Sequence, residues 1–136
     1  MRYNNSMENI ITWQEIDRAR LLAKCNRYAD AYWLELTRRN SALSRYTRPE
    51  IRLNARFSNM AGRCYDDLSF IDLGLKFFPK YHVRMFNEVL PHEICHAADF
   101  AINKTPCTAK QSHGKKWQNL MLQLGLIPSQ FHDMTL

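Results

Sequence analysis

The chain contains an H-E-x-x-H motif at His92–His96, inside an apolar stretch of helical character that runs from Val89 to Ile102. Residues four apart on a helix lie one above the other on the same face, so the two imidazoles can bind one metal ion. Glu93 lies about 100° around the helix axis, where its carboxylate can reach a water molecule on that ion. Two nitrogen ligands, one carboxylate base and an open coordination position are what a zinc-dependent hydrolase needs.

A third ligand is needed, and the residues after His96 limit the choice. No glutamate follows Glu93, which excludes the class of enzyme in which a downstream glutamate binds the metal. The extended motif H-E-x-x-H-x-x-G-x-x-H requires Gly at position 99 and His at position 102, and this chain has neither. The remaining candidates are Asp99, His113, His132 and Asp133.

Of these four residues, we expect His113 to bind the metal. Asp99 lies three residues after His96, where a carboxylate orients an imidazole more easily than it binds the ion; its other interpretation is an ordinary exposed helix acid. His132 and Asp133 lie close to a C-terminus, where chains often fray. His113 begins the last expected helix, after a loop long enough to fold back over the motif.

The composition is that of a folded chain of domain size. Of the 136 residues, 46% are hydrophobic and 12% are aromatic, so we expect a single domain over residues 1–136 whose core needs no disulfides. No apolar stretch approaches the roughly 18 residues of a membrane span, and the polar N-terminus lacks the apolar segment of a signal peptide. We therefore expect no membrane partner.

The four cysteines, Cys25, Cys64, Cys95 and Cys107, show no C-x-x-C spacing, which argues against a structural zinc knuckle. Free thiols in a reducing compartment are the simplest explanation, and they predict a cytoplasmic protein. Cys95 and Cys107 are also metal donors in principle. Cys95, however, lies one step off the histidine face and is expected to be a small buried residue.

The net charge of +6 is unevenly distributed. Between Arg38 and Arg63 there are seven arginines and one acid, Glu50. Such clusters attract polyanions, and phosphate backbones are the commonest of them, so we favour DNA as a partner. The alternative is a solvated basic face that keeps the protein soluble, because no base-reading motif is present. A second basic group follows the motif and consists of Lys104, Lys110, Lys115 and Lys116.

A long helix is expected at the start of the chain. Thr12 and Glu15 form a capping box, and apolar residues recur at helical spacing up to about Arg39. The apolar positions include Ala23, Tyr28, Ala31 and Leu34, and Tyr32 and Trp33 are also expected in the core.

The pattern then changes from a helical period to alternation. Residues 51–57 alternate between apolar and polar side chains, which predicts a strand with one buried and one basic face. Further strands are expected near 63–65 and over 68–73, joined by a tight reversal at 66–67. A small antiparallel meander of three strands fits these segments best.

The second half of the chain predicts two more helices. The motif-bearing helix is expected over Val83–Ile102, although Pro91 removes one hydrogen bond. The helix therefore either bends just before His92 or starts later. A final amphipathic helix is expected over Lys115–Leu124, with Gly125 at the position of a C-terminal cap.

Several separated motifs resemble the SprT-like zinc metalloprotease family. They are P-H-E-x-x-H at 91–96, H-G-x-x-W at 113–117 and the L-G-x-x run at 124–127. Upstream, A-G-R-C-Y and I-D-L within 61–73 resemble the hairpin and the strand of that family. The resemblance extends over about 52–128, and its specificity is high because the motifs occur in the right order.

The resemblance implies a minimal zincin-like α+β fold: a long N-terminal helix, a small three-stranded antiparallel sheet, a motif-bearing helix and a C-terminal helix. It implies His92, His96 and His113 as ligands of Zn²⁺ and Glu93 as the catalytic acid/base. Eukaryotic members are DNA-activated proteases that degrade proteins crosslinked to DNA. The resemblance therefore implies a zinc metalloendopeptidase that acts on DNA-bound proteins. The cysteine-rich zinc ribbon that many members carry after this domain has no counterpart in the sequence.

Ordinary zinc chemistry gives the expected mechanism. Glu93 takes a proton from the attacking water and passes it to the leaving amine. Tyr65, Tyr81 and His82 are candidates for oxyanion stabilisation by sequence proximity alone, and a packing role is expected for each. The alternative function is a zinc-stabilised adaptor that binds DNA without proteolysis. Glu93 favours the enzyme, because a purely structural site needs no general base.

Overall fold

The structure is a computed structural model that describes residues 15–129 and 133–136. It combines helices with a small sheet, so the predicted α+β class is confirmed. The expected capping residue Thr12 lies outside the described residues. In chain order the helices and strands are α1 (Glu15–Arg39), β1 (Glu50–Asn54), β2 (Gly62–Cys64), β3 (Phe70–Gly74), α2 (Phe78–Arg84), α3 (Leu90–Asn103) and α4 (Lys115–Gln123).

The three strands form a mixed sheet in the order β1-β3-β2. The strands alternate in direction along the chain as predicted, but β3 lies between the other two and is therefore parallel to β1 and antiparallel to β2. The prediction of a fully antiparallel meander is wrong. The connection over residues 55–61 is long enough for β2 to lie one strand position away from β1, and β3 fills the position between them. The alternation of apolar and polar residues within a strand does not indicate which strand lies next to it.

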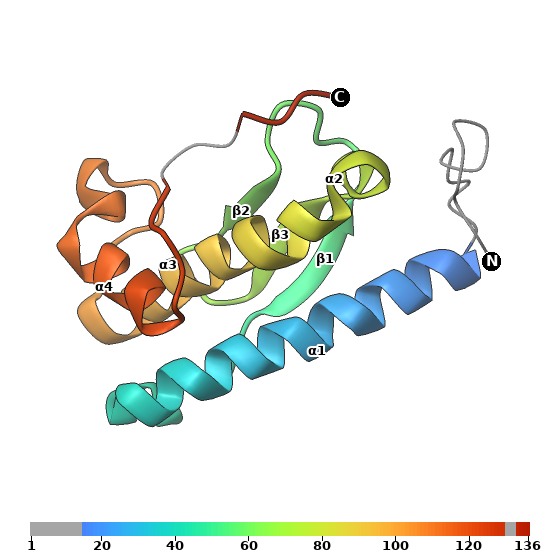
Figure 1. The fold of residues 1–136 in the computed structure, drawn as a ribbon. Coiled ribbons are helices and arrows are strands. Elements are labelled where there is room, and N and C mark those ends of the chain that lie inside the picture. Colours follow the sequence, from blue (N-terminus) through green and yellow to red (C-terminus); the bar gives the residue numbers. More distant parts are fainter. Residues whose placement is uncertain (1–14, 130–132) are drawn as a thin grey trace.

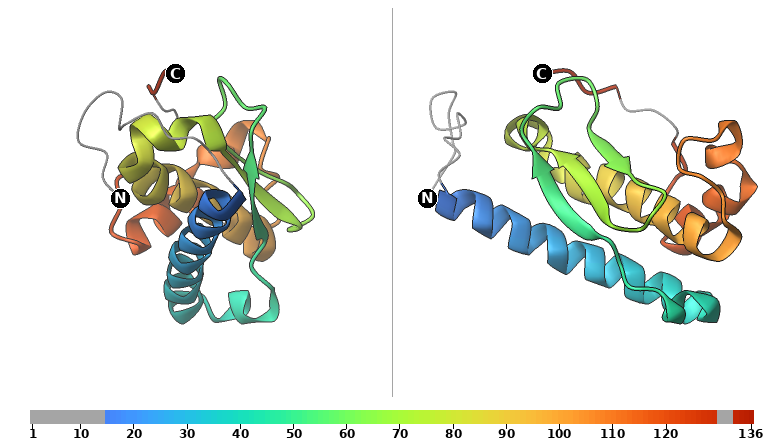
Figure 2. Two further views of the ribbon diagram at one scale, coloured as in Figure 1. Left: turned by 90° about the vertical axis from the view of Figure 1, so that its right-hand side faces the viewer. Right: turned by 180° about the vertical axis from the view of Figure 1, so that it is seen from behind.

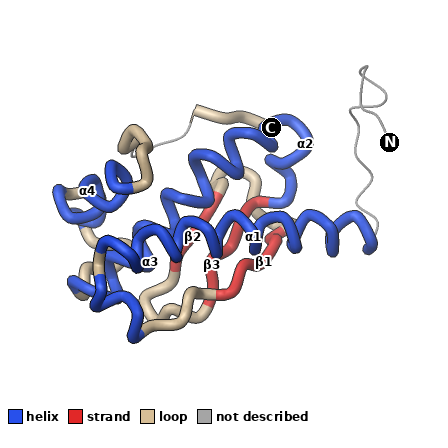
Figure 3. The backbone as a smooth tube through the Cα atoms, turned by 60° about the horizontal axis from the view of Figure 1, so that its bottom comes forward, coloured by secondary structure: helices blue, strands red, loops and turns tan. Residues whose placement is uncertain are grey.

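Helices α1 and α3 cover one face of the sheet, and the other face is open (Figures 1 and 2). Ile51 of β1 and Ile71 of β3 stand opposite each other in the sheet and are both buried in the core. Helix α4 packs against α3 at the end remote from α2 (Figure 3). The core therefore lies between the sheet and the helices, and α3 runs through its centre.

The buried side of α1 differs from the predicted one. Leu34, which belonged to the predicted apolar stripe, is 54% exposed, whereas Leu36 is fully buried. Trp33 is buried, as expected. The helix carries apolar residues on more than one side, so spacing alone does not identify the face that packs on α3 and the sheet. The buried positions are Cys25, Ala29, Trp33 and Leu36.

An acid is buried on the open face of the sheet. Asp72 of β3 is 2% exposed and stands opposite Arg52 of β1 and Arg63 of β2. Its carboxylate accepts hydrogen bonds from Arg52 Nε and Tyr65 Oη, each at 2.7 Å. The guanidinium of Arg52 lies 3.8 Å from the centre of the Phe70 ring and shields the acid. Burial raises the pKa of Asp72, but the hydrogen bonds, chiefly from Arg52 and Tyr65, outweigh burial and lower it.

Candidate metal centre

The helix that carries the motif follows an irregular turn. Residues 85–89 form one π-helical turn, and α3 begins directly after it, with Pro91 in its first turn. Because Pro91 has no N–H, the Phe86 carbonyl five residues earlier lacks the partner that a continued π-turn would supply. Tyr32 of α1 replaces that partner, since its hydroxyl donates to the Phe86 carbonyl oxygen at 2.9 Å. The irregularity expected at Pro91 is therefore a π-turn held by a side chain from another helix.

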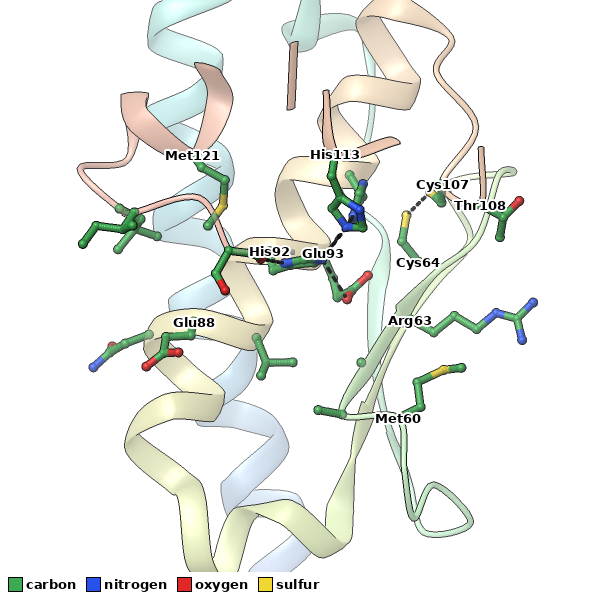
Figure 4. A pocket seen from close by; sticks show the side chains of 18 of the residues that line it. Met60, Arg63, Cys64, Glu88, His92, Glu93, Cys107, Thr108, His113 and Met121 are labelled. Atoms are coloured by element: carbon green, nitrogen blue, oxygen red, sulfur yellow. Dashed lines mark hydrogen bonds and ion pairs between the residues drawn. The ribbon is translucent and has the colours of Figure 1, made fainter. Parts of the chain in front are cut away.

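Three imidazoles converge beside α3 (Figure 4). His92 and His96 lie one turn apart on α3, and His113 ends the short 3-10 turn over 110–113 that precedes α4. Their Nε2 atoms are 3.2 Å (His92–His96), 3.0 Å (His96–His113) and 3.1 Å (His113–His92) apart. Nitrogen ligands roughly 2.0–2.1 Å from one tetrahedral zinc ion are about 3.3 Å from each other. The three atoms are therefore spaced to bind a single ion.

Hydrogen bonds support the ring of His92 and the backbone of His113. His92 Nδ1 lies 3.1 Å from the Ser129 carbonyl oxygen. A carbonyl only accepts, so Nδ1 carries the hydrogen and Nε2 keeps its lone pair for a metal. Near His113, the Gln118 amide donates to the His113 carbonyl oxygen at 2.9 Å. The first contact orients the His92 ring, and the second fixes the backbone that carries His113.

Trp117 of α4 packs against all three imidazoles. It is fully buried, and its ring centre lies 4.8 Å from those of His92 and His113. It is 5.3 Å from His96, with the two rings stacked at 19°. The indole Nε1 also donates to the His92 carbonyl oxygen at 3.2 Å. One side chain thus connects α4 to every member of the histidine cluster.

Burial favours the uncharged form of two of the three imidazoles. It lowers the pKa of His96 to about 2, with neighbouring His92 and His113 adding to the effect. Burial also lowers the pKa of His113. Neutral imidazoles are the form that binds metal ions, so His96 and His113 are in the ligand state at neutral pH.

Glu93 reaches the same space from the next position on α3. It is 8% exposed, and its Oε2 lies 4.0 Å from His92 Nε2. Burial raises the pKa of Glu93 to about 8, against an opposing hydrogen bond from the Cys64 backbone N–H. Gly62 of β2 leaves room for the carboxylate, because a Cβ there would lie 2.9 Å from Val89 Cγ1 and 3.0 Å from Glu93 Cγ. The edge of β2 therefore adjoins the acid directly.

These groups lie in a cleft of about 1190 Å³ (Figure 4). Residues 59–64, in β2 and the turn before it, form one wall, and residues 125–129, after α4, form another. Helix α3 contributes the histidines and Glu93 between them. Side chains of apolar character contribute much of the lining: Met60, Val89, Met121, Leu126 and Ile127.

A search against protein families identifies the chain. The model of the SprT-like family matches residues 27–135, which include the H-E-x-x-H motif and His113. The chain belongs to the SprT-like family. Searches of curated proteins and of solved structures found no match. Within this SprT-like chain, no helix of the described part is long and apolar enough to cross a membrane.

The other candidate ligands of this SprT-like chain lie apart from the cluster. Asp99 is buried, and its Oδ1 accepts hydrogen bonds from Asn103 and Thr105, so it is neither an exposed acid nor one of the clustered donors. Asp133 is exposed and pairs with Arg84 at 2.7 Å. His132 lies outside the described residues. Cys95 is fully buried, as expected.

The three candidates for oxyanion stabilisation have other surroundings. Tyr65 donates to Asp72 on the sheet, and Tyr81 donates to the Thr135 carbonyl oxygen at 2.9 Å. His82 is exposed on α2. None of the three is among the residues that line the cleft.

Four residues that shape the site were not predicted in these roles. Trp117 and Gly62 belong to motifs of the family resemblance, but their contacts with the imidazoles and with Glu93 depend on the packing of α4 and β2. The Ser129 carbonyl and the Tyr32 hydroxyl leave no signal in the sequence, because any residue presents a carbonyl and the Tyr32–Phe86 pairing spans 54 positions. The four residues are Tyr32, Gly62, Trp117 and Ser129.

Proposed function

We propose that this SprT-like protein is a zinc-dependent endopeptidase, with His92, His96 and His113 as metal ligands and Glu93 as the general base and acid. The observation that carries the proposal is a set of three Nε2 atoms 3.0–3.2 Å apart, beside a buried carboxylate in an open cleft. Structural zinc sites are closed by a fourth protein ligand. Among the described residues no fourth donor joins the three histidines, as expected for a catalytic site.

Zinc suits this donor set. Imidazole nitrogens at these mutual distances match tetrahedral coordination, and three protein ligands leave one position open. Zinc in such a site supplies Lewis-acid chemistry, which polarises a carbonyl and makes water nucleophilic at neutral pH. The contacts of His92 with Ser129 and of Trp117 with the three rings support the ligands from outside.

Glu93 moves the proton in the proposed reaction. A cation held by the three histidines would favour the ionised carboxylate against the effect of burial. The ionised Oε2 accepts a proton from the attacking water and then donates it to the nitrogen of the leaving peptide. The Cys64 backbone N–H that bonds to the carboxylate, together with the space at Gly62, holds it in place for both transfers. The low exposure of Glu93 limits proton exchange with bulk water.

The substrate we propose is an extended stretch of polypeptide. Strand β2 lies at the edge of the sheet and pairs only with β3 among the described strands. Residues 60–64, which include β2, line the cleft beside Glu93. An added strand can bind such an edge through main-chain hydrogen bonds, while pockets receive alternate side chains. The apolar walls at Val89 and Leu126 favour an apolar side chain next to the cleaved bond.

Proteins held on DNA are the substrates we propose for the cell, and exposed basic residues support this. Surface ion pairs are weak, so the arginines paired with the surface acids Glu35 and Asp30 can exchange these partners for phosphate, whereas Arg52 is held by the buried Asp72. Arg45, Arg56 and Arg63 are exposed and belong to none of the ion pairs found among the described residues. Four of the seven arginines are paired with acids: Arg38 and Arg39 with Glu35, Arg48 with Asp30, and Arg52 with Asp72.

The test compares wild-type protein with Glu93→Gln in the presence of zinc. We expect wild type to cleave an unfolded protein or a DNA-bound protein, and Glu93→Gln to lose at least about 10²-fold in rate, the scale of general acid–base catalysis. Glu93→Gln should keep one zinc per chain, because it leaves the three histidines intact.

Single-stranded DNA is added or withheld in parallel assays. Faster cleavage with DNA supports the DNA-held substrate, and unchanged cleavage removes that part of the proposal. Equal cleavage by both proteins would contradict the proposed role of Glu93. Zinc binding and DNA binding without any cleavage by wild type would replace the enzyme with an adaptor function.

A further inference from the structure

Two thiols meet at the edge of the cleft, outside the proposed metal site. Cys64 Sγ, at the end of β2, lies 2.7 Å from Cys107 Sγ, on the loop that leads from α3 to His113 (Figure 4). This is closer than the roughly 3.5–4.0 Å at which carbon atoms, which are smaller than sulfur, have their best contact. A disulfide is about 2.05 Å long, so the two sulfurs need to approach by only about 0.7 Å to form one.

Cys64 and Cys107 line the cleft, and the other two cysteines do not. Cys25 and Cys95 are fully buried, whereas Cys107 is partly exposed and lines the cleft together with Cys64. The Cys107 backbone N–H donates to Asp66 Oδ1 at 2.6 Å, which holds the loop against the β2–β3 turn. A small oxidant that enters the cleft therefore meets a fixed pair of thiols.

We propose that Cys64 and Cys107 form a reversible redox site, which a hydroperoxide oxidises to a disulfide that ties the His113 loop to β2. The Cys107 thiol donates to the Cys64 sulfur, and the Cys64 thiol donates to the Tyr65 carbonyl oxygen at 3.7 Å. In the proposed reaction Cys64 is the attacking sulfur and Cys107 the resolving one. Cys64 loses its proton to water, and its sulfur attacks the peroxide as the O–O bond breaks. A sulfenic acid forms, and the leaving alkoxide or hydroxide takes up one proton to give an alcohol or water. Cys107 then attacks that sulfur, and the hydroxyl leaves as water with the Cys107 proton. Two thiols are oxidised, and one peroxide is reduced.

The surroundings of Cys107 favour its protonated form. The hydrogen bond to Cys64, then burial, then the nearby Asp66 raise the pKa of Cys107. A protonated thiol is a poor nucleophile, so spontaneous exchange with other disulfides is slow. Attack by Cys107 itself is therefore slow, and the first attack on the peroxide falls to Cys64.

Closure of the disulfide has a consequence for the third histidine. His113 lies six positions after Cys107 on the same connection, while His92 and His96 lie on α3. A covalent tie to β2 restricts movement of the His113 loop away from α3. We expect the oxidised protein to lose its metal more slowly. This second part rests on the proposed zinc site, whereas bond formation does not.

The first experiment treats the zinc-loaded full chain with hydrogen peroxide. The expected result is an intact mass lower by two hydrogen atoms, one peptide that joins Cys64 to Cys107 in a non-reducing digest, and reversal by dithiothreitol. Disulfides typically stabilise, so the melting temperature should rise by roughly 10 °C. Cys25→Ala should behave as wild type, and Cys107→Ser should show neither the joined peptide nor the temperature shift. Added oxygen atoms without a joined peptide, or a different pairing, overturn the redox site.

The second experiment measures the rate at which zinc is released to a chelator that changes colour when it binds zinc. Oxidised wild type should release zinc roughly tenfold more slowly than reduced wild type. Contacts that hold metal ligands in position commonly have effects of this size on metal binding. Peroxide should not slow release from Cys107→Ser. Equal rates for oxidised and reduced wild type overturn the effect on the metal. A chain that forms the disulfide but binds no zinc contradicts the proposed function and leaves the redox site in place.

Discussion

Gly62 and Trp117 carry no chemistry of their own, yet the groups of the site depend on them. Trp117 contacts all three imidazoles, so a change in the position of α4 reaches each proposed ligand at once. Gly62 provides the space in which the Glu93 side chain lies. The proposed catalytic residues are thus positioned by residues from α4 and β2, and not by α3 alone.

Gly62→Ala tests the position of the Glu93 carboxylate separately from metal binding by the three histidines. The added Cβ would lie 2.9 Å from Val89 Cγ1 and 3.0 Å from Glu93 Cγ, so the Glu93 side chain has to move. A misplacement of about 1 Å costs about 10²-fold in rate. We expect proteolysis to fall by that factor, measured on an unfolded protein substrate, while zinc content stays at one per chain. Val83→Ala is the control, because it shortens an exposed side chain of α2 that does not line the cleft. Loss of zinc together with activity in Gly62→Ala would contradict this role.

The convergence of the three histidines could be predicted from the sequence, because spacing and residue type restrict the alternatives. His113 was favoured over Asp99 and Asp133, and the structure brings His113 together with the other two imidazoles. The carbonyl of Ser129 could not be predicted, because the path of the chain after α4 decides which backbone oxygen meets His92.

Among the secondary-structure elements, predictions of type succeeded and predictions of arrangement failed. Strand β3 separates β1 from β2, although alternation correctly indicated all three strands. In α1 the stripe that contains Leu34 competes with the one that contains Leu36, and only contact with α3 and the sheet decides between them. The helical stretch that leads to the motif begins at Phe78, five residues earlier than expected, because α2 and the π-turn run directly into α3.

Tyr32→Phe tests the support of that π-turn. The variant keeps the ring and removes the hydroxyl that satisfies the Phe86 carbonyl. An unsatisfied buried acceptor costs about 1–3 kcal/mol, so we expect the free energy of unfolding to fall by that amount in urea titrations. Tyr28→Phe is the matched control, because the Tyr28 ring itself packs on Phe86 at 4.8 Å between centres. Equal losses in the two variants would show that the Tyr32 hydroxyl has no special role.

The free energy of unfolding should depend on pH in the acidic range, because of the carboxylate of Asp72 in the sheet. Its folded pKa lies below the unfolded value of about 3.9. The stabilisation it contributes is therefore fully present above that value and is lost as the pH falls through the folded pKa. Asp72→Asn should cost about 1–3 kcal/mol at pH 7 by weakening the bonds to Arg52 and Tyr65.

The measurement is urea unfolding of wild type and Asp72→Asn between pH 7 and pH 3. The difference between the two proteins should narrow as the pH falls below about 4, because only wild type loses the contribution of the ionised carboxylate. Asp30→Asn removes an exposed ion pair with Arg48 and should change stability little at any pH. A constant difference down to pH 3 would contradict the role of Asp72.

In the whole molecule, the proposed site joins two parts of the chain. His92 and His96 belong to α3 in the centre of the core, while His113 arrives on the connection to α4 (Figure 1). A metal ion that binds all three imidazoles links that connection to the core without any change in the packing of α3. Metal binding should therefore be visible in the stability of the entire fold.

Zinc should stabilise the folded protein by mass action, because the three histidines converge only in the folded state. At a free zinc concentration about 1,000 times the dissociation constant, the gain is about 4 kcal/mol. For a chain of this size, that corresponds to a rise of roughly 10–20 °C in melting temperature, which a chelator should reverse. His113→Ala leaves two of the three proposed ligands and should lose most of the rise. His82→Ala, which removes an exposed histidine of α2, should retain it. If zinc raised the melting temperature of His113→Ala as much as that of wild type, the stabilising ion would be bound elsewhere, and His113 would not be a ligand.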